Sequence, residues 1–152
     1  MKVALVTGGG SGIGRSAALE LNKIDFTVYV VGRRKEELIK TSSLATNNNH
    51  KIIPIKTDIT IGSQVIALFD KIKSDHGRID LLFNNAGMGA PRVPIEDLKE
   101  EDWRKTVDVN LTGSFLCSQQ AIKLMKNQSP QGGRLVNNGS VSAHSPRPDT
   151  IA

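Results

Sequence analysis

Short apolar runs alternate along this chain with longer segments in which apolar residues recur every three or four positions. The short runs predict β-strands, and the longer periodic segments predict amphipathic α-helices. The run over residues 26–31 is apolar except for Thr27, a pattern typical of a parallel strand covered on both faces. The pattern predicts strands over residues 2–7, 26–31, 51–56, 79–83 and 134–138, and helices over residues 12–24, 35–45, 61–76 and 101–127.

The apolar stripes of three helices predict which side of each helix is buried. Thr60 is expected to cap the N-terminus of the helix over residues 61–76. The predicted apolar faces are Ile13, Ala17, Ala18, Leu21 and Ile24 in the first helix, Val65, Leu68, Phe69 and Ile72 in the third, and Trp103, Val107, Leu111, Phe115, Ile122 and Met125 in the fourth.

Strands that alternate with helices predict an α/β fold, here a doubly wound parallel sheet of the Rossmann type with right-handed crossovers. The expected strand order is 3-2-1-4-5. Pro54 favours an edge position for the third strand, because proline has no N–H for the hydrogen-bond ladder. A length of 152 residues is that of one domain with a sizeable core.

A glycine-rich turn over residues 7–14 joins the first strand to the first helix. Such a turn lets the backbone approach a pyrophosphate, and the helix N-terminus offers free N–H groups and partial positive charge. A run of glycines alone is weak evidence, but the strand before it and the helix after it are the context that a dinucleotide site requires.

Composition narrows the remaining classes of protein. The net charge is +5, but Lys and Arg are scattered apart from the cluster at 33–35, and aromatic residues are 4% of the chain, which argues against nucleic-acid binding. No apolar run approaches the ~20 residues of a membrane span. Met1 leads directly into the first strand and Cys117 is the single cysteine, so we expect no targeting peptide and a cytoplasmic location. No metal site is predicted.

The spacing Thr7-Gly8-x-x-x-Gly12-x-Gly14 differs from the commoner G-x-G-x-x-G. It resembles the signature of the short-chain dehydrogenases/reductases, and further motifs of that family recur in order over all 152 residues. The resemblance implies that residues 1–152 are an NAD(P)-binding domain, C-terminally incomplete after the fifth strand. The cofactor-binding residues that it implies in this turn are Thr7, Gly8, Ser11, Gly12, Ile13 and Gly14.

Gly32-Arg33-Arg34 follows the second strand, where NAD-binding members of the family typically place an acidic residue for the adenosine ribose. A guanidinium suits a 2′-phosphate, so Arg33 favours NADP(H), with NAD(H) as the alternative cofactor. A second interpretation is that Arg33 and Arg34 only solvate the start of the next helix. Arg15 is open to the same two interpretations.

Two more segments are similar to cofactor-binding positions of the family. After the third strand, the resemblance assigns Asp58 to the adenine amino group and Ile59 to a backbone contact. The alternative is that Asp58 is a turn residue. After the fourth strand comes Asn84-Asn85-Ala86-Gly87, in which Asn84, Ala86 and Gly87 are the expected cofactor contacts.

Two polar residues are candidates for catalysis. Asn110 is predicted on the apolar face of the long helix, where a buried amide needs its hydrogen bonds met, and the resemblance implies that it holds a water in a proton relay. The alternative is an Asn bonded only to backbone. Ser140, at the end of the fifth strand, would bind the substrate carbonyl. Ser140 is favoured over Ser142 for this role. The alternative interpretation is that Ser140 is only a turn residue.

The sequence departs from the family pattern at the proton donor. The family uses a Tyr as general acid/base and a Lys four residues later, whereas this chain has one tyrosine, Tyr29, in the second strand. The family's Tyr is due about a dozen residues after Ser140, at Ala152. We therefore expect an N-terminal portion that is inactive alone.

The function that the resemblance implies is an NADP(H)-preferring oxidoreductase, which transfers hydride between nicotinamide and a carbonyl or alcohol substrate. Its partners would be small molecules, without nucleic acid or membrane, and the complete protein would form a homo-oligomer. The alternative function is that of a non-catalytic dinucleotide-binding module.

Overall fold

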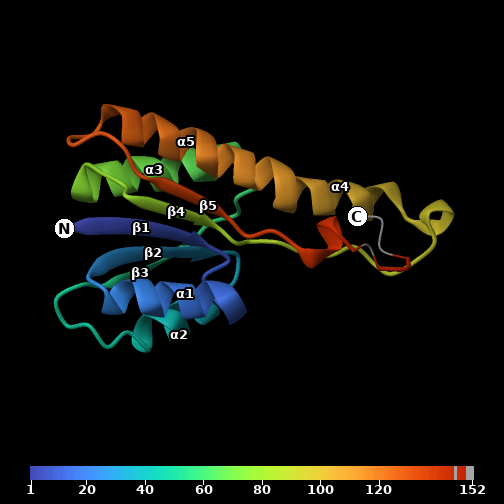
Figure 1. Ribbon diagram of the computed structural model, residues 1–152, viewed down its shortest axis with the longest axis horizontal. Helices are drawn as coiled ribbons and strands as arrows, with labels where there is room; N and C mark the ends of the chain where they lie inside the picture. Colours follow the sequence, from blue (N-terminus) through green and yellow to red (C-terminus); the bar gives the residue numbers. More distant parts are fainter. Residues whose placement is uncertain (146, 150–152) are drawn as a thin grey trace.

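The computed structural model describes residues 1–145 and 147–149. Five parallel strands form one sheet in the order β3-β2-β1-β4-β5 (Figure 1). This confirms the predicted fold class and strand order. The strands are β1 (Lys2–Thr7), β2 (Phe26–Gly32), β3 (Ile52–Lys56), β4 (Leu81–Asn84) and β5 (Arg134–Asn137), and the α-helices are α1 (Gly12–Lys23), α2 (Lys35–Ser43), α3 (Gly62–His76), α4 (Glu100–Val107) and α5 (Gly113–Asn127).

Helices cover both faces of the sheet, with α1 and α2 on one side and α3 and α5 on the other (Figure 1). Alternate residues of each strand enter the two cores, as the pleat requires. Leu5 and Tyr29 belong to the core on the α3 side, while Ala4 and Val28 belong to the core on the α1 side. The central strands β1 and β2 are therefore buried on both faces, as their apolar runs predict.

The third strand lies at an edge of the sheet, as Pro54 predicts. Pro54 is opposite Val30 of β2, and β3 has no neighbour on its other side among the described residues. The missing N–H of Pro54 is therefore compatible with the ladder. The prediction of an edge strand is confirmed.

The predicted cap of α3 is wrong. Its N-terminal cap position is Ile61 rather than Thr60. The Thr60 hydroxyl instead donates to Asp58 Oδ1 at 2.8 Å, and the Thr60 N–H donates to the same oxygen at 3.0 Å. The turn after β3 therefore uses the Thr60 hydroxyl itself, which leaves it unavailable to cap the helix.

The predicted buried face of α1 is also partly wrong. Ile13 and Ile24 are exposed, whereas Gly14, Ala18 and Asn22 are buried. These three residues recur every four positions and carry small or medium side chains, so the helix backbone approaches the sheet closely. The requirement for close packing outweighs the hydrophobicity of Ile13 and Ile24.

The long predicted helix is continuous but contains a π-helical turn, η2 (Asp108–Thr112), between α4 and α5. Four residues of the predicted stripe are exposed, namely Trp103, Leu111, Phe115 and Ile122. The buried side is formed by Gly113, Cys117, Ala121, Leu124 and Met125, so only Met125 of the prediction is buried. The exposed apolar residues lie both before and after η2. In α5, the small side chains of Cys117 and Ala121 face the core in place of Phe115, which lets the helix pack closely.

Small residues bring α5 close to its neighbours. A Cβ on Gly113 would lie 2.7 Å from Ile59 Cδ1, so glycine is required there for packing. Burial raises the pKa of the Cys117 thiol to about 12, which keeps it protonated and unreactive at neutral pH.

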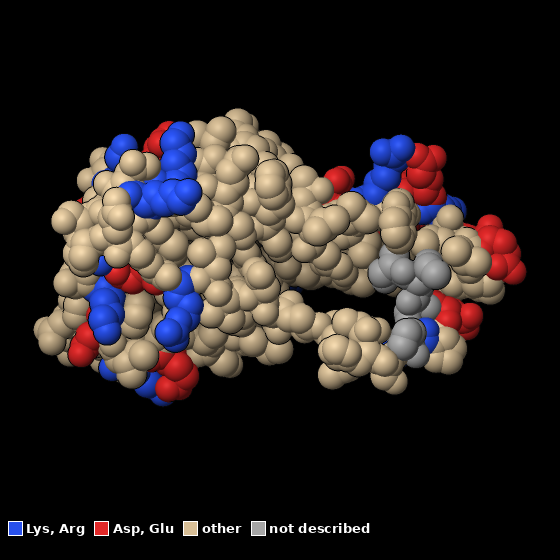
Figure 2. Space-filling view, turned by 45° about the horizontal axis from the view of Figure 1, so that its top comes forward, with Lys and Arg blue, Asp and Glu red and all other residues tan. Residues whose placement is uncertain are grey.

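Figure 2 shows the charged side chains gathered at the two ends of the molecule, with a broad uncharged area between them.

Candidate functional site

A cavity of about 420 Å³ opens at the carboxyl edge of the sheet. In Figure 1 this is the side toward which the strand arrows point. The strand order reverses at β1, and ligands of doubly wound sheets bind outside such a switch point. The lining comes from the turns after four strands and from the helices beside them: Gly8, Gly10, Ser11, Val31, Gly32, Arg33, Arg34, Glu37, Leu38, Thr57, Asp58, Ile59, Asn85, Ala86, Gly87, Met88 and Val109.

The glycine turn has a conformation that only glycine satisfies. Gly8 and Gly12 have φ values of +66° and +52°. A Cβ on Gly8 would lie 2.9 Å from Ala86 Cα, and a Cβ on Gly14 would collide with the Gly8 carbonyl oxygen. At Gly8 and Gly14 the turn therefore lies against the segment after β4 with no room for a Cβ.

Thr7 and Asn85 hold the turns after β1 and β4 together. Thr7 is buried, and its Oγ1 accepts hydrogen bonds from the N–H groups of Asn85 and Ala86, both at 3.0 Å. The Asn85 side-chain amide donates to the Thr7 carbonyl at 3.0 Å. Thr7 therefore lies behind the cavity wall and fixes its shape.

Three residues connect the glycine turn to α2. The Thr41 hydroxyl donates to the Gly9 carbonyl at 2.9 Å and accepts from Arg15 Nε at 3.0 Å. The Arg15 guanidinium also donates to the Gly10 carbonyl and pairs with Glu37 Oε2 at 2.9 Å. The carbonyls of Gly9 and Gly10 are thus engaged on the α2 side of the turn.

Glu37 is a charged residue in the wall of the cavity. Besides Arg15, its carboxylate binds Lys40 Nζ at 2.6 Å. The hydrogen bonds from Lys40 and then from Arg15 hold the pKa of the Glu37 carboxyl below its usual value, so Glu37 is ionised at neutral pH. Arg33 and Arg34 also line the cavity, and neither forms an ion pair with any residue that the structure describes.

Asp58 and Ile59 lie at the adjoining wall, after β3. Asp58 lines the cavity and also accepts the two hydrogen bonds from Thr60, so it has the turn contacts of the alternative interpretation as well. The Ile59 side chain is buried beneath Gly113. Ile59 therefore lies between the cavity and α5.

Asn84 does not line the cavity. Its buried side chain donates to Ser118 Oγ and to Asn137 Oδ1, both at 2.9 Å, which joins β4 to α5 and β5. Asn85, the next residue, is the member of the pair that lines the cavity. The Asn138 amide donates to Asn85 Oδ1 at 3.1 Å, which extends the network to the segment after β5.

Asn110 is exposed, so its predicted burial on the apolar face is wrong. The π-helical turn presents the side chain to the loop after β4 instead of to the core. Its Oδ1 accepts from the Met88 N–H at 2.9 Å and its Nδ2 donates to the Met88 carbonyl at 2.8 Å. Because Met88 and Gly87 line the cavity, Asn110 lies at its rim.

Ser140 lies outside the cavity lining. It is exposed, and its Oγ accepts from the Ser142 N–H at 3.1 Å at the start of the 3₁₀ turn η3 (Val141–Ala143). This is the contact of a turn residue. The position near Ala152 where the family's Tyr is due is outside the described residues.

The sequence model of the short chain dehydrogenases matches residues 2–152. The chain belongs to this family. The expected resemblance is confirmed.

Relatives within the short-chain dehydrogenases are longer than this chain. This chain is 36% identical over 141 residues to a 3beta-hydroxysteroid dehydrogenase of Mediterraneibacter gnavus. The aligned segment covers 93% of this chain and 50% of that protein. The chain also resembles NAD⁺-bound xylitol dehydrogenase, with a TM-score of 0.91 and 30% identity over 98% of the chain and 56% of the solved chain. For a metagenomic short-chain oxidoreductase in complex with NADP, the TM-score is 0.91 and the identity is 26%. That match covers 98% of this chain and 66% of the solved chain. The chain thus spans about half the length of the first of these relatives.

The cavity brings together seven of the predicted site residues and leaves seven outside its lining. Those in the lining are Gly8, Ser11, Arg33, Asp58, Ile59, Ala86 and Gly87; those outside it are Thr7, Gly12, Ile13, Gly14, Asn84, Asn110 and Ser140. The lining residues that sequence reasoning missed include Glu37, Asn85 and Val109. The signal for Asn85 is its place between Asn84 and Ala86 in the same motif, whereas the role of Glu37 depends on pairing between two helices.

No helix of the described residues has the length and apolar character needed to cross a membrane. Within the same residues, no cluster of three His, Cys, Asp or Glu side chains is arranged to hold a metal ion.

Proposed function

We propose that this chain binds NADP(H) in preference to NAD(H), as part of an oxidoreductase that moves hydride between the nicotinamide and a carbonyl or alcohol. The observation that carries the proposal is the pair Arg33 and Arg34 in the cavity wall, with Gly32 where an acidic residue would contact the adenosine ribose. A planar guanidinium binds a phosphate through two hydrogen bonds, so these two cations favour a 2′-phosphate.

The other walls of the cavity fit the remaining parts of such a cofactor. The glycine turn offers backbone N–H groups to the diphosphate at the start of α1, and any Cβ at Gly8 or Gly14 would close the space between the turns. Asp58 would accept from the adenine amino group. Ala86 and Gly87 would contact the inner face of the cofactor.

When bound, the nicotinamide ring would supply or accept the hydride. Asn110 would hold the loop at Met88 and a water at the rim of the site, and Ser140 would hydrogen-bond the substrate carbonyl. The metagenomic neighbour was solved with NADP and xylitol dehydrogenase with NAD⁺, so the family neighbours bind either cofactor.

We also propose that these 152 residues do not turn over by this mechanism alone. The single tyrosine, Tyr29, is buried in β2 and donates to Asp75 Oδ2 at 2.5 Å. Burial, and then the bond to Asp75, raise the pKa of Tyr29 above its ordinary value, and Tyr29 does not line the cavity. Small-molecule substrates, a homo-oligomeric complete protein and a cytoplasmic location remain predictions.

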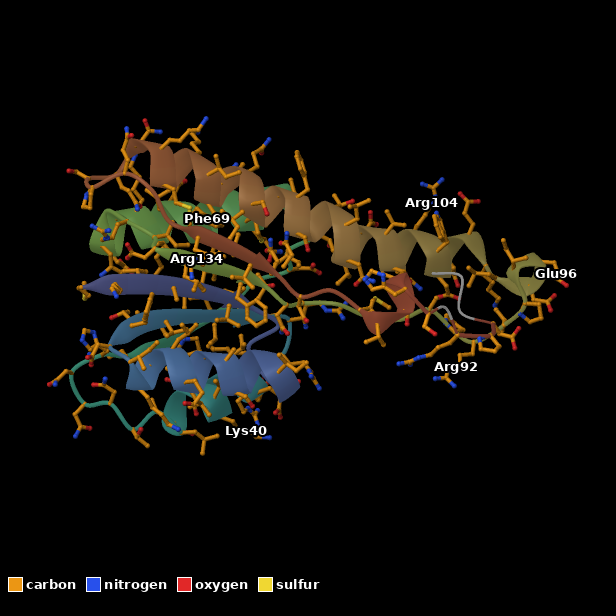
Figure 3. All side chains as sticks on the ribbon, in the orientation of Figure 1. Lys40, Phe69, Arg92, Glu96, Arg104 and Arg134 are labelled. Atoms are coloured by element: carbon orange, nitrogen blue, oxygen red, sulfur yellow. The ribbon has the colours of Figure 1, made fainter. Side chains whose placement is uncertain are left out.

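The test is fluorescence titration of the purified chain with NADPH and NADH, for wild type, Arg33→Ala and Arg104→Ala. Arg104 pairs with Glu100 on α4, away from the cavity (Figure 3), and serves as the matched control. We expect NADPH to bind more tightly than NADH, and Arg33→Ala to weaken NADPH about tenfold while NADH changes little. Unchanged selectivity in Arg33→Ala would overturn the assignment of NADP(H).

Turnover needs a separate assay. Oxidation of NADPH in the presence of cyclohexanone, by a preparation of verified mass, would overturn the proposal that the chain is inactive alone. Binding without turnover would agree with both proposals.

A further inference from the structure

The charges in the cavity wall cancel. Of the lining residues, Arg33 and Arg34 are positive, and Glu37 and Asp58 are negative. Asp58 is engaged by Thr60 in the turn after β3. Glu37 lies on the first turn of α2, three residues after Arg34. A dianionic phosphate near the arginines would therefore meet a wall whose net charge is reduced by Glu37.

Glu37 also holds two further cations. Arg15 donates to Glu37 Oε2 at 2.9 Å and Lys40 to Oε1 at 2.6 Å. Lys40 extends from α2 in Figure 3. Arg15 does not line the cavity, but its guanidinium donates to the carbonyl of Gly10, which does. The side chains of Arg15 and Glu37 are only 25% and 26% exposed, so solvent screens this pair less than a surface pair.

We infer that Glu37 is a specificity-determining residue of this site, which limits the preference for a 2′-phosphorylated nucleotide by holding Arg15 and by offsetting Arg33 and Arg34. The inference rests on the proposed binding of a dinucleotide. It concerns selectivity between two ligands that differ by one phosphate, and it assigns Glu37 no part in the chemical step.

Replacement of Glu37 has a definite expected sign. Glu37→Gln keeps the size of the side chain but removes one negative charge from the wall and loosens the hold on Arg15. The affinity ratio of NADPH over NADH should rise by about three- to tenfold, because the wall then carries one negative charge fewer near the 2′-phosphate. The same ratio should rise for 2′,5′-ADP over 5′-AMP.

Glu36→Gln is the matched control. Glu36 is in the same turn of α2, is exposed and does not line the cavity, so its replacement makes the same change in net charge and in the charge at the helix N-terminus. The ratio should stay close to wild type in this variant. Thermal unfolding of each variant would show whether α2 remains folded, and a ratio of affinities is independent of the folded fraction.

A double variant tests the role of Arg15. If Glu37 acts partly through Arg15, the rise in the ratio should be smaller when Glu37→Gln is made in Arg15→Gln than in wild type. An unchanged or lowered ratio in Glu37→Gln, or equal rises in Glu36→Gln and Glu37→Gln, would overturn the inference. Failure of the wild type to bind either cofactor would overturn the proposed function instead.

Discussion

The side-chain amide of Asn85 donates to the carbonyl of Thr7, 78 positions earlier in the chain, at a distance of 3.0 Å. This bond joins the turn after β4 to the turn after β1. The Thr7 hydroxyl also joins the two turns, because it accepts hydrogen bonds from the N–H groups of Asn85 and Ala86. The cavity between the turns is therefore shaped by buried polar contacts in addition to the apolar core.

Replacing Asn85 with Ala should destabilise the chain and weaken cofactor binding. The variant leaves the buried Thr7 carbonyl without this donor, which costs about 1–3 kcal/mol, and removes the partner of Asn138. Urea unfolding and NADPH titration would measure the two effects. Asn48→Ala, at an exposed loop position, is the control, and equal losses in the two variants would contradict the prediction.

Replacing Gly113 with Ala should destabilise the chain in spite of the better helix propensity of alanine. The new methyl group would lie 2.7 Å from both Cγ1 and Cδ1 of Ile59, and overpacking of this kind costs about 1–3 kcal/mol. The measurement is urea unfolding of Gly113→Ala.

A second substitution tests the cause. Ile59→Val removes Cδ1, so it should recover part of the loss when combined with Gly113→Ala, although it is destabilising by itself. Gly62→Ala, where a Cβ would meet nothing within 4 Å, is the control for helix propensity. Additive losses in the double variant would show that the two residues do not clash.

Stability should fall with acid through Asp80. Burial favours the protonated form of Asp80, but the bonds from Arg78 and the Val3 N–H outweigh it and hold the pKa of the carboxyl below its usual value. A depressed pKa in the folded state contributes stability above the unfolded pKa of about 4 and loses it as pH falls through the folded pKa.

Urea unfolding between about pH 7 and pH 2 would measure this dependence. Asp80→Asn should lower the free energy of unfolding at neutral pH and flatten its fall with acid. Asp70→Asn, at an exposed position of α3 with no ion pair among the described residues, should leave the pH dependence unchanged. An acid dependence that persists undiminished in Asp80→Asn would assign the effect to other carboxyls.

The strands could be predicted because continuous apolar runs are local patterns. Their order followed from the doubly wound fold class, and the proline of β3 agreed with an edge position. The faces of α1 and of the long helix could not be predicted in the same way. Close packing selects Gly14 and Ala18 over the larger Ile13 in α1. In α5 it selects Cys117 and Ala121 over the larger Phe115.

The glycine turn was accessible from the sequence because its backbone conformation restricts the residue type. The contributions of Glu37 and Asn84 were not. Glu37 acquires its contacts from Arg15 on another helix, and the residue type of Asn84 does not distinguish a link between β4 and β5 from a ligand contact. Side chains whose partners are distant in the sequence need the folded structure to be interpreted.

The π-helical turn η2 joins α4 to α5 within one continuous helix, so its length fixes the rotation of one half relative to the other. Each residue advances an α-helix by about 100°, so the deletion of one residue from this turn would rotate everything before it relative to α5. Asn110 would then leave Met88, while Cys117 and Ala121 would keep their places in the core. The length of the segment between Val107 and Gly113, as much as the identity of Asn110, is therefore under constraint in this chain.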